Sequence, residues 1–187
     1  VGVNFDLYVN NTSAVADSYN LSFGSTSSLP LSAAALSTAG WTVVFHLGSA
    51  AGPVISNTGS IPAGGQAHIV AVVTPPANAA GNVTTDVFFA AVSASTLSGD
   101  VKRDAVTVNP LHDLSIIASS SASTPANTGY IFTHTLTNLG NVTETSDVIS
   151  ASSAYAAVVY LDANNNGVLD GTDPIFSNIS QDYIVLF

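Results

Sequence analysis

The stretch NFDLYVN at Asn4–Asn10 decides the fold class, because apolar and polar residues alternate along it. Phe5, Leu7 and Val9 fall on one face of an extended strand, and the residues between them fall on the other. A period of two is typical of an antiparallel sheet with one buried side. The stretch therefore predicts a β-strand whose odd-numbered side chains enter a core.

Similar short runs follow along the chain, each rich in Val, Ile, Phe, Tyr or Thr and bounded by Gly, Pro, Asn or Ser. The predicted strands are Ser18–Phe23, Thr42–Leu47, Ala67–Thr74, Thr85–Ser93, Ala105–Val108, Leu114–Ser119, Tyr130–Asn138, Ala156–Leu161 and Tyr183–Phe187. For the short, Ala-rich Leu31–Ala39 segment we expect a loop or a single turn. Two packed antiparallel sheets bury such strands economically, which predicts an all-β fold of antiparallel β-sandwiches. The expected core face of the first is Phe5, Leu7, Val9, Trp41, Val43, Phe45, Ile69, Ala71 and Val73.

Composition excludes several classes of function. The 187 residues hold 2 Lys+Arg against 12 Asp+Glu, a net charge of −10, which leaves no basic surface for a nucleic acid. The longest apolar run, Ala154–Leu161, is far short of the roughly 20 residues of a membrane helix. Cysteine is absent, which excludes disulfides and thiolate metal sites. A surface of Ser, Thr, Asn, Gly and Asp with two basic residues favours an extracellular setting.

The sequence also contains an internal similarity. Sliding the chain by 127 positions aligns Phe5, Val9, Asn11, Val15 and Asp17 with Phe132, Leu136, Asn138, Val142 and Glu144. Further along, at an offset of 115, Gln66–Val70 matches Gln181–Val185. We interpret the two halves as copies of one module, which predicts domains at residues 1–110 and 111–187 with Pro110 in a short linker. The alternative is chance similarity among strands rich in Val and Thr.

The two copies differ in which strands they contain. A predicted strand at Leu114–Ser119 precedes the Tyr130 strand of the second copy, whereas the first copy begins at the equivalent of that later strand. The second copy stops at the strand that matches Ala67–Val73. We therefore expect the first sandwich to lack its first strand and the second to be truncated at its C-terminus, as in a fragment of a longer tandem array.

The strongest chemical motif is DANNNGVLDGTD at Asp162–Asp173. Aligned with a twelve-residue calcium loop, its oxygen-bearing side chains fall at positions 1, 3, 5, 9 and 12, with Gly167 at the sixth. The expected calcium ligands are the side chains of Asp162, Asn164, Asn166, Asp170 and Asp173 and the carbonyl of Val168. Because the preceding segment has a strand pattern and Pro174 follows, we expect strands rather than helices on both sides. The alternative interpretation is a plain turn between strands.

Several motifs resemble one family. GWTVVF at residues 40–45 and VVTPPA at residues 72–77 resemble bacterial Ig-like modules described as alpha-galactosidase-associated or conserved repeat domains. YIFTHTLTNLGNVTET at residues 130–145 is similar to the conserved repeat domain of large surface-layer and adhesin-like envelope proteins. The resemblance implies tandem Ig-like β-sandwiches on a bacterial cell surface, with neighbouring repeats and like subunits as partners, and it supplies no catalytic residues.

The expected function is a structural repeat module of a bacterial surface-layer or envelope protein, rigidified by calcium. The alternative is an accessory glycan- or receptor-binding module of a secreted enzyme, adhesin or pilus. Trp41 lies in phase with Val43 and Phe45, so we expect it in the core rather than on a sugar-binding surface. No nucleophile or metalloprotease motif such as GxSxG or HExxH occurs, and we do not expect an enzyme.

Overall fold

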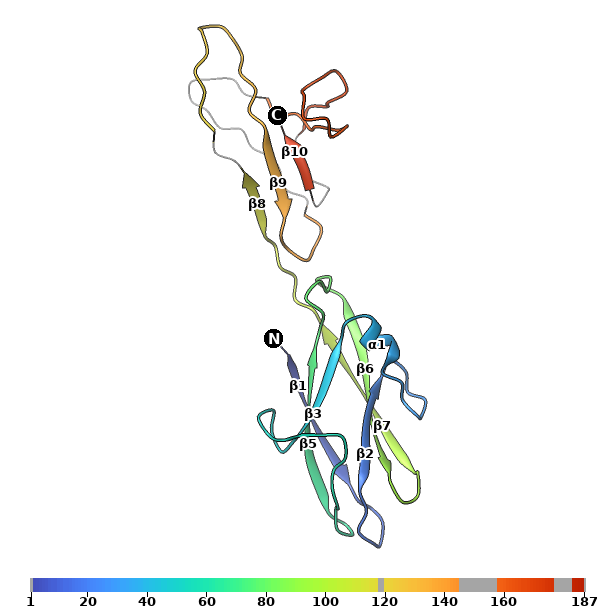
Figure 1. The fold of residues 1–187 in the computed structure, drawn as a ribbon. Coiled ribbons are helices and arrows are strands. Elements are labelled where there is room, and N and C mark those ends of the chain that lie inside the picture. Colours follow the sequence, from blue (N-terminus) through green and yellow to red (C-terminus); the bar gives the residue numbers. More distant parts are fainter. Residues whose placement is uncertain (1, 118–119, 145–157, 177–182, 187) are drawn as a thin grey trace. The chain divides into compact units, whose positions relative to one another are not determined.

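The structure is a computed structural model that describes residues 2–117, 120–144, 158–176 and 183–186. It divides into two compact units, Val1–Val108 and Asn109–Phe187. All described elements are antiparallel β-strands except one five-residue helix (Figure 1). The predicted all-β class with antiparallel sheets is therefore confirmed.

The first unit consists of two antiparallel sheets that pack face to face (Figure 1). One sheet has the order β1-β5-β3-β4 and the other the order β2-β6-β7. The elements are β1 Val3–Asn10, β2 Tyr19–Gly24, α1 Ala34–Thr38, β3 Thr42–Leu47, β4 Val54–Ile55, β5 Gln66–Thr74, β6 Thr84–Ser93 and β7 Gly99–Thr107. Both sheets contribute side chains to one core.

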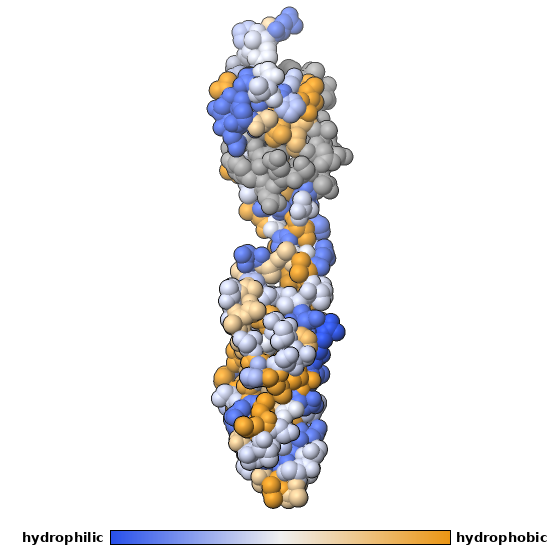
Figure 2. All heavy atoms as spheres, turned by 90° about the vertical axis from the view of Figure 1, so that its right-hand side faces the viewer, coloured by the Kyte–Doolittle hydropathy of each residue, from blue (hydrophilic) through white to orange (hydrophobic). Residues whose placement is uncertain are grey.

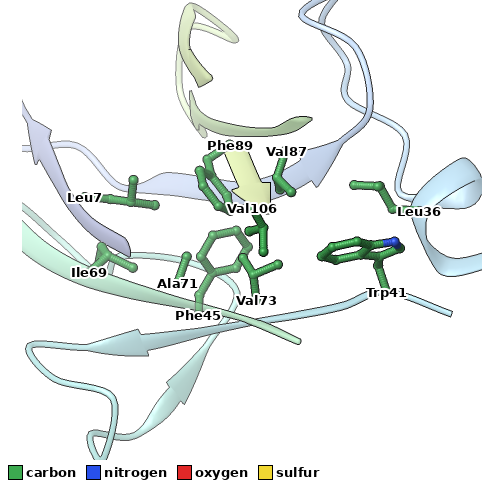
Figure 3. Close-up of a cluster of buried hydrophobic side chains, with 10 residues drawn as sticks. All are labelled: Leu7, Leu36, Trp41, Phe45, Ile69, Ala71, Val73, Val87, Phe89 and Val106. Atoms are coloured by element: carbon green, nitrogen blue, oxygen red, sulfur yellow. The ribbon is translucent and has the colours of Figure 1, made fainter. Parts of the chain in front are cut away.

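The core of the first unit contains the residues that the period of two selects. Leu7, Trp41, Phe45, Ile69, Ala71 and Val73 are buried, and Phe5, Val9 and Val43 pack against them. Figure 3 shows the six buried side chains facing Val87, Phe89 and Val106 of the opposite sheet. The predicted core face is therefore confirmed, including the place of Trp41, which is 7% exposed. Tyr8 and Val44, which are out of phase, are exposed.

One element of the first unit agrees with expectation and one differs from it. The segment at Leu31–Ala39 contains α1, a five-residue helix that corresponds to the expected single turn, and Leu36 anchors it in the core at 4% exposure. Strand β7 begins at Gly99, six residues before the predicted start at Ala105. The sequence pattern fails there because Lys102 and Arg103 stand in an edge strand, where charged side chains reach water.

The second unit contains a three-stranded antiparallel sheet of order β10-β9-β8. Its strands are β8 Leu114–Ile117, β9 His134–Asn138 and β10 Tyr183–Leu186. Leu136 of β9 is buried, and Val159, Leu161 and Phe176 pack against it. The strand predicted at Ala156–Leu161 begins outside the described residues.

The end of β1 and the end of β9 have the same local structure. Nδ2 of Asn11 donates to the carbonyl of Val15 at 2.8 Å, and Nδ2 of Asn138 donates to the carbonyl of Val142 at 2.7 Å. Each Asn also accepts from the backbone N–H two residues later, at 3.0 Å and 2.8 Å respectively. This side-chain-to-backbone turn fixes the exit of the chain from the strand in both units.

The surface is mixed in character. Figure 2 shows one face, on which hydrophobic (orange) and hydrophilic (blue) residues are interspersed. Within the described part of the chain, no helix has the length and apolar character needed to cross a membrane.

Candidate metal centre

The predicted ligand segment forms a loop that is closed at its neck. Tyr160 and Ile175 form an antiparallel β-bridge on either side of it. The N–H of Leu161 donates to the carbonyl of Pro174 at 3.0 Å, and the N–H of Phe176 donates to the carbonyl of Val159 at 2.9 Å. The loop therefore lies between two extended, paired segments, and no helix flanks it within the described residues.

The first and last residues of the loop organise its backbone. Asp162 and Asp173 are 5% and 7% exposed. The carboxylate of Asp162 accepts from the N–H groups of Asn166 at 3.1 Å and Gly167 at 2.9 Å. The carboxylate of Asp173 accepts from the N–H groups of Ala163 at 3.1 Å and Asp170 at 2.9 Å. The loop therefore holds two buried carboxyl groups near its neck, each hydrogen-bonded to two backbone N–H groups.

Asp170 is the point at which the predicted asparagine ligands meet. Its Oδ2 accepts from the side-chain amides of Asn164 at 3.2 Å and Asn166 at 2.9 Å. Its Oδ1 accepts from the N–H of Thr172 at 2.8 Å and from the hydroxyl of Thr172 at 2.6 Å. The structure thus brings three of the predicted ligands into direct contact.

The electrostatics of the loop follow from these bonds. The hydroxyl of Thr172, followed by the Thr172 backbone N–H and the amides of Asn166 and Asn164, lowers the pKa of Asp170 to about 2. The carboxylate remains ionised at every pH above that range. Asp170 therefore presents a permanent negative charge on the exposed side of the loop.

The sharp turn lies where the sequence motif places it. Gly167 has a φ of 73° and Asn165 a φ of 58°, both in the left-handed region that Gly and Asn adopt at low cost. The N–H of Val168 donates to Oδ1 of Asn166 at 2.7 Å, so Val168 belongs to the same turn. A Cβ on Gly167 would meet no atom within 4 Å, which shows that the backbone angle rather than space requires glycine here.

Thr172 is the residue that the sequence pattern did not identify. It occupies the eleventh position, which supplies no ligand in the twelve-residue scheme. In the structure its hydroxyl also accepts from the amide of Asn164 at 2.9 Å. Among the described residues, no group of three or more His, Asp or Glu side chains lies close enough together to hold a metal ion. Any ion in this loop must therefore take part of its coordination from amide, hydroxyl or backbone oxygens.

The other polar pairs lie outside this loop. Nε2 of His68 lies 2.7 Å from Asp6, and the His68 ring stacks on Tyr8 with centroids 4.8 Å apart, on the exposed face of β1 and β5. Nδ1 of His112 lies 2.7 Å from the largely buried Glu144 in the second unit.

Comparisons with known proteins give little further information. No family model matches the chain, and no curated protein matches it. Among solved structures, the crystal structure of the Pseudomonas aeruginosa CupB2 chaperone is similar at 9% identity and a TM-score of 0.34. The match covers 98% of this chain and 80% of that one.

This comparison corrects the function expected from the sequence. The solved structure is a chaperone, which has a different role from a surface-layer structural module. We therefore retain neither the structural role in a surface layer or envelope nor the alternative of an accessory glycan- or receptor-binding module. At this TM-score the likeness assigns no role of its own to the chain.

Proposed function

We propose that the chain is a calcium-binding β-sheet protein, in which the loop between Tyr160 and Ile175 holds the ion. The observation that carries the proposal is the convergence of oxygen side chains in one closed loop. Asp162 and Asp173 are buried at its neck, and Asp170 is held ionised beside two asparagine amides. Calcium takes six to eight hard oxygen ligands, and this loop offers carboxylate, amide, hydroxyl and carbonyl oxygens only.

The chemistry of the donor set fits a hard cation. Asp162, Asp170 and Asp173 supply negative charge, and Asn164 and Asn166 each have a carbonyl oxygen that a half-turn of the amide directs toward the Asp170 side. Val168 would add its backbone carbonyl, as the loop pattern expects. A softer metal would require imidazole or thiolate ligands, which the loop sequence does not contain.

An ion in this loop would stabilise the second unit. Its described core is small, with Leu136 as the buried centre and three partly buried neighbours. A ligand that binds only the folded state at one hundred times its Kd contributes about 2.7 kcal/mol. The loop connects the segments that pack on Leu136. A bound ion would therefore lower the conformational entropy of the segments that form this core.

The proposal extends to the kind of module and its setting. The sheet orders of the first unit and the shared asparagine turns of Asn11 and Asn138 support tandem Ig-like modules that associate with neighbouring modules and like subunits. The net charge of −10 and the content of only two basic residues support an extracellular setting, where calcium is at millimolar concentration. The proposed role is binding rather than catalysis.

Calorimetric titration of the 187-residue chain with calcium tests the proposal. We expect one site, and we expect the Asp170→Asn variant to lose most of the affinity because the substitution removes one negative ligand while keeping its size. The matched control is Asp113→Asn, which removes an exposed carboxylate of the same unit outside the loop and should bind as the parent does. Absence of binding heat at about 1 mM calcium, a concentration that suits extracellular modules, would overturn the proposal.

A further inference from the structure

The first unit has an unprotected sheet edge. Its two sheets end at β1, β4, β2 and β7. Natural sheets blunt such edges with charge, short strands or covering loops, because exposed N–H and C=O groups pair readily with other strands. Strand β7 carries Lys102 and Arg103, which pair with Asp104 at 2.8 Å and Asp86 at 2.9 Å. Strand β4 is two residues long. Both edges are therefore protected.

The edge at β2 is covered by the chain itself. The N–H of Leu21 donates to the carbonyl of Ser56 at 2.8 Å, and the N–H of Thr58 donates to the carbonyl of Tyr19 at 3.0 Å. The segment around Ser56 thus occupies the side of β2 that faces away from β6. This leaves β1 as the remaining edge of the first unit.

Strand β1 has none of these protections within the described residues. It is eight residues long, contains no Lys or Pro, and carries one charge, at Asp6. On its other side it pairs with β5 along its whole length. It is the longest edge strand of the unit that has no segment covering it, no row of charged residues and no interruption of the strand.

The direction of its free groups follows from the ladder. The N–H of Asn11 donates to Gly65 at 2.9 Å, and the N–H of Gly48 donates to His68 at 2.9 Å on the other side of β5. In an antiparallel ladder the bonded residues alternate, so odd-numbered residues of β1 bond to β5. The N–H and C=O groups of its even-numbered residues therefore point away from β5. These residues are Asn4, Asp6, Tyr8 and Asn10.

The second unit shows what the corresponding edge accepts. Strand β9 ends in the same asparagine turn as β1, and β10 pairs with it as β5 pairs with β1. On its opposite side, β9 carries the antiparallel strand β8. Ser115 lies opposite Thr137 and Ile117 lies opposite Thr135 in this pairing. The N–H of Leu139 donates to the carbonyl of Asp113 at 2.8 Å, which puts the odd-numbered residues of β8 in the bonded positions.

We propose that the β1 edge is a binding site for an extended strand of the β8 type, and that it accepts this strand when the strand is added as a separate peptide. The strand is antiparallel to β1, free of charge over its paired residues and apolar at the positions that face the core. If Thr137 corresponds to Asn10 and Thr135 to Tyr8, the residue equivalent to Ser115 pairs with Asn10 and that equivalent to Ile117 pairs with Tyr8. Recognition would occur through backbone hydrogen bonds, with alternate side chains giving specificity.

A cleft next to β1 provides room for the alternate side chains. Its volume is about 540 Å³, and Leu7 and Val9 of β1 line it together with Leu21, Phe89 and the β7 residue Lys102. In the register taken from β8, the positions of Leu114 and Ile116 fall on the same side of the sheet as Val9. The incoming strand would thus bury apolar side chains where Leu7 and Val9 border the cleft.

Charge argues against a second copy of β1 as the occupant. Two β1 strands paired antiparallel along their full length would bring both Asp6 carboxylates into neighbouring cross-strand positions, which is destabilising. Each chain also carries a net charge of −10. A strand of the β8 type has no charge between Leu114 and Ile117 and avoids this repulsion.

Hydrogen exchange on the 187-residue chain tests the proposal, with a capped peptide of the sequence of residues 111–121 as the probe. We expect the peptide to slow exchange of the amides of Asn4, Asp6, Tyr8 and Asn10 by about tenfold or more. Peptides N-methylated at Ser115 or Ile117 should lose this effect because those N–H groups face β1. Peptides N-methylated at Leu114 or Ile116 are the matched controls and should retain it.

A protein variant supplies an independent readout. Tyr8→Pro removes one outward N–H and none that faces β5, and we expect it to abolish the peptide effect while β5 and β6 amides stay protected. No slowing at the β1 amides would overturn the proposal. So would slowing confined to Thr135 and Thr137, which would show exchange with β8, or slowing that grows with protein concentration without peptide, which would show a second copy. The same measurement in a calcium chelator separates this proposal from the calcium site.

Discussion

The hydroxyl of Thr172 lies 2.6 Å from Oδ1 of Asp170 and makes the largest contribution to the low pKa of that carboxyl. The Asp170 pKa of about 2 lies below its ordinary value of 3.8. A carboxyl whose pKa is lowered on folding stabilises the folded state above its unfolded pKa. This contribution is lost as pH falls from 3.8 to about 2.

We therefore predict that Thr172→Val raises the pKa of Asp170 toward 3.8, because the variant removes the hydroxyl donor and keeps the shape. Titration of the Asp170 carboxyl carbon by NMR measures the change. Thr143→Val alters an exposed threonine of the same unit and should leave the titration as it is. An unchanged pKa in the Thr172 variant would show that the backbone and amide donors alone set it.

Asn11→Ala should destabilise the first unit by about 3 kcal/mol. The side chain is 1% exposed, and its Nδ2 donates to the carbonyls of Val15 at 2.8 Å and Ile61 at 2.9 Å. Alanine leaves these carbonyls without that donor, and the bond to Ile61 is buried. Urea denaturation followed by the fluorescence of Trp41 measures the loss, and the exposed Asn4→Ala provides the control. A loss equal to that of the control would contradict the prediction.

Phe89→Ala should cost about 3–5 kcal/mol of the free energy of unfolding. The Phe89 ring lies 5.8 Å from that of Phe5 and 6.1 Å from that of Phe45, so it joins the two sheets across the core. The cavity left by alanine removes these contacts. Val44→Ala changes a residue of β3 that is 37% exposed and should cost about 1 kcal/mol or less. Thermal or urea unfolding compares the two variants.

Calcium should stabilise the second unit alone. The loop packs within that unit, whereas Trp41, the sole tryptophan, is buried in the first. We expect calcium to slow hydrogen exchange at Leu136 and Leu161 and to leave the tryptophan-detected unfolding curve unchanged. A calcium-dependent shift of the tryptophan curve would mean that the ion also stabilises the first unit.

The period of two was sufficient to predict the core of the first unit, because each sheet there has one buried face. Strand β7 was predicted too short because its first part contains Lys102 and Arg103, although edge strands accept charge. The strand pairing also changes the alignment of the two halves that the sequence suggested, by two residues at the strand that contains Ile69. If Val9 corresponds to Leu136, the pairing makes Ile184 equivalent to Ala67 rather than to Ile69. A shift of two residues keeps every side chain on its face, so the sequence pattern could not detect it.

The turn of the candidate site was predictable from the sequence, whereas its hydrogen bonds were not. Spacing alone selected Asp162, Asn164, Asn166, Asp170 and Asp173, and Gly167 has the positive φ that the motif requires. The role of Thr172 depends on a side-chain rotamer and on the fold of the loop around it. Spacing contains no information on either.

The two basic residues of the chain, Lys102 and Arg103, are adjacent and both lie in β7. A trypsin-like protease cleaves after Lys or Arg and needs its substrate extended and unpaired, so it can cut this chain only when β7 leaves β6. Nine residues of β7 pair with β6, and Val106, which is 4% exposed, is anchored in the core. The rate of tryptic cleavage therefore reports local opening of one strand at one place. Cleavage after Lys102 or Arg103 can therefore be used to measure how often β7, the edge of the sheet opposite β2, separates from β6.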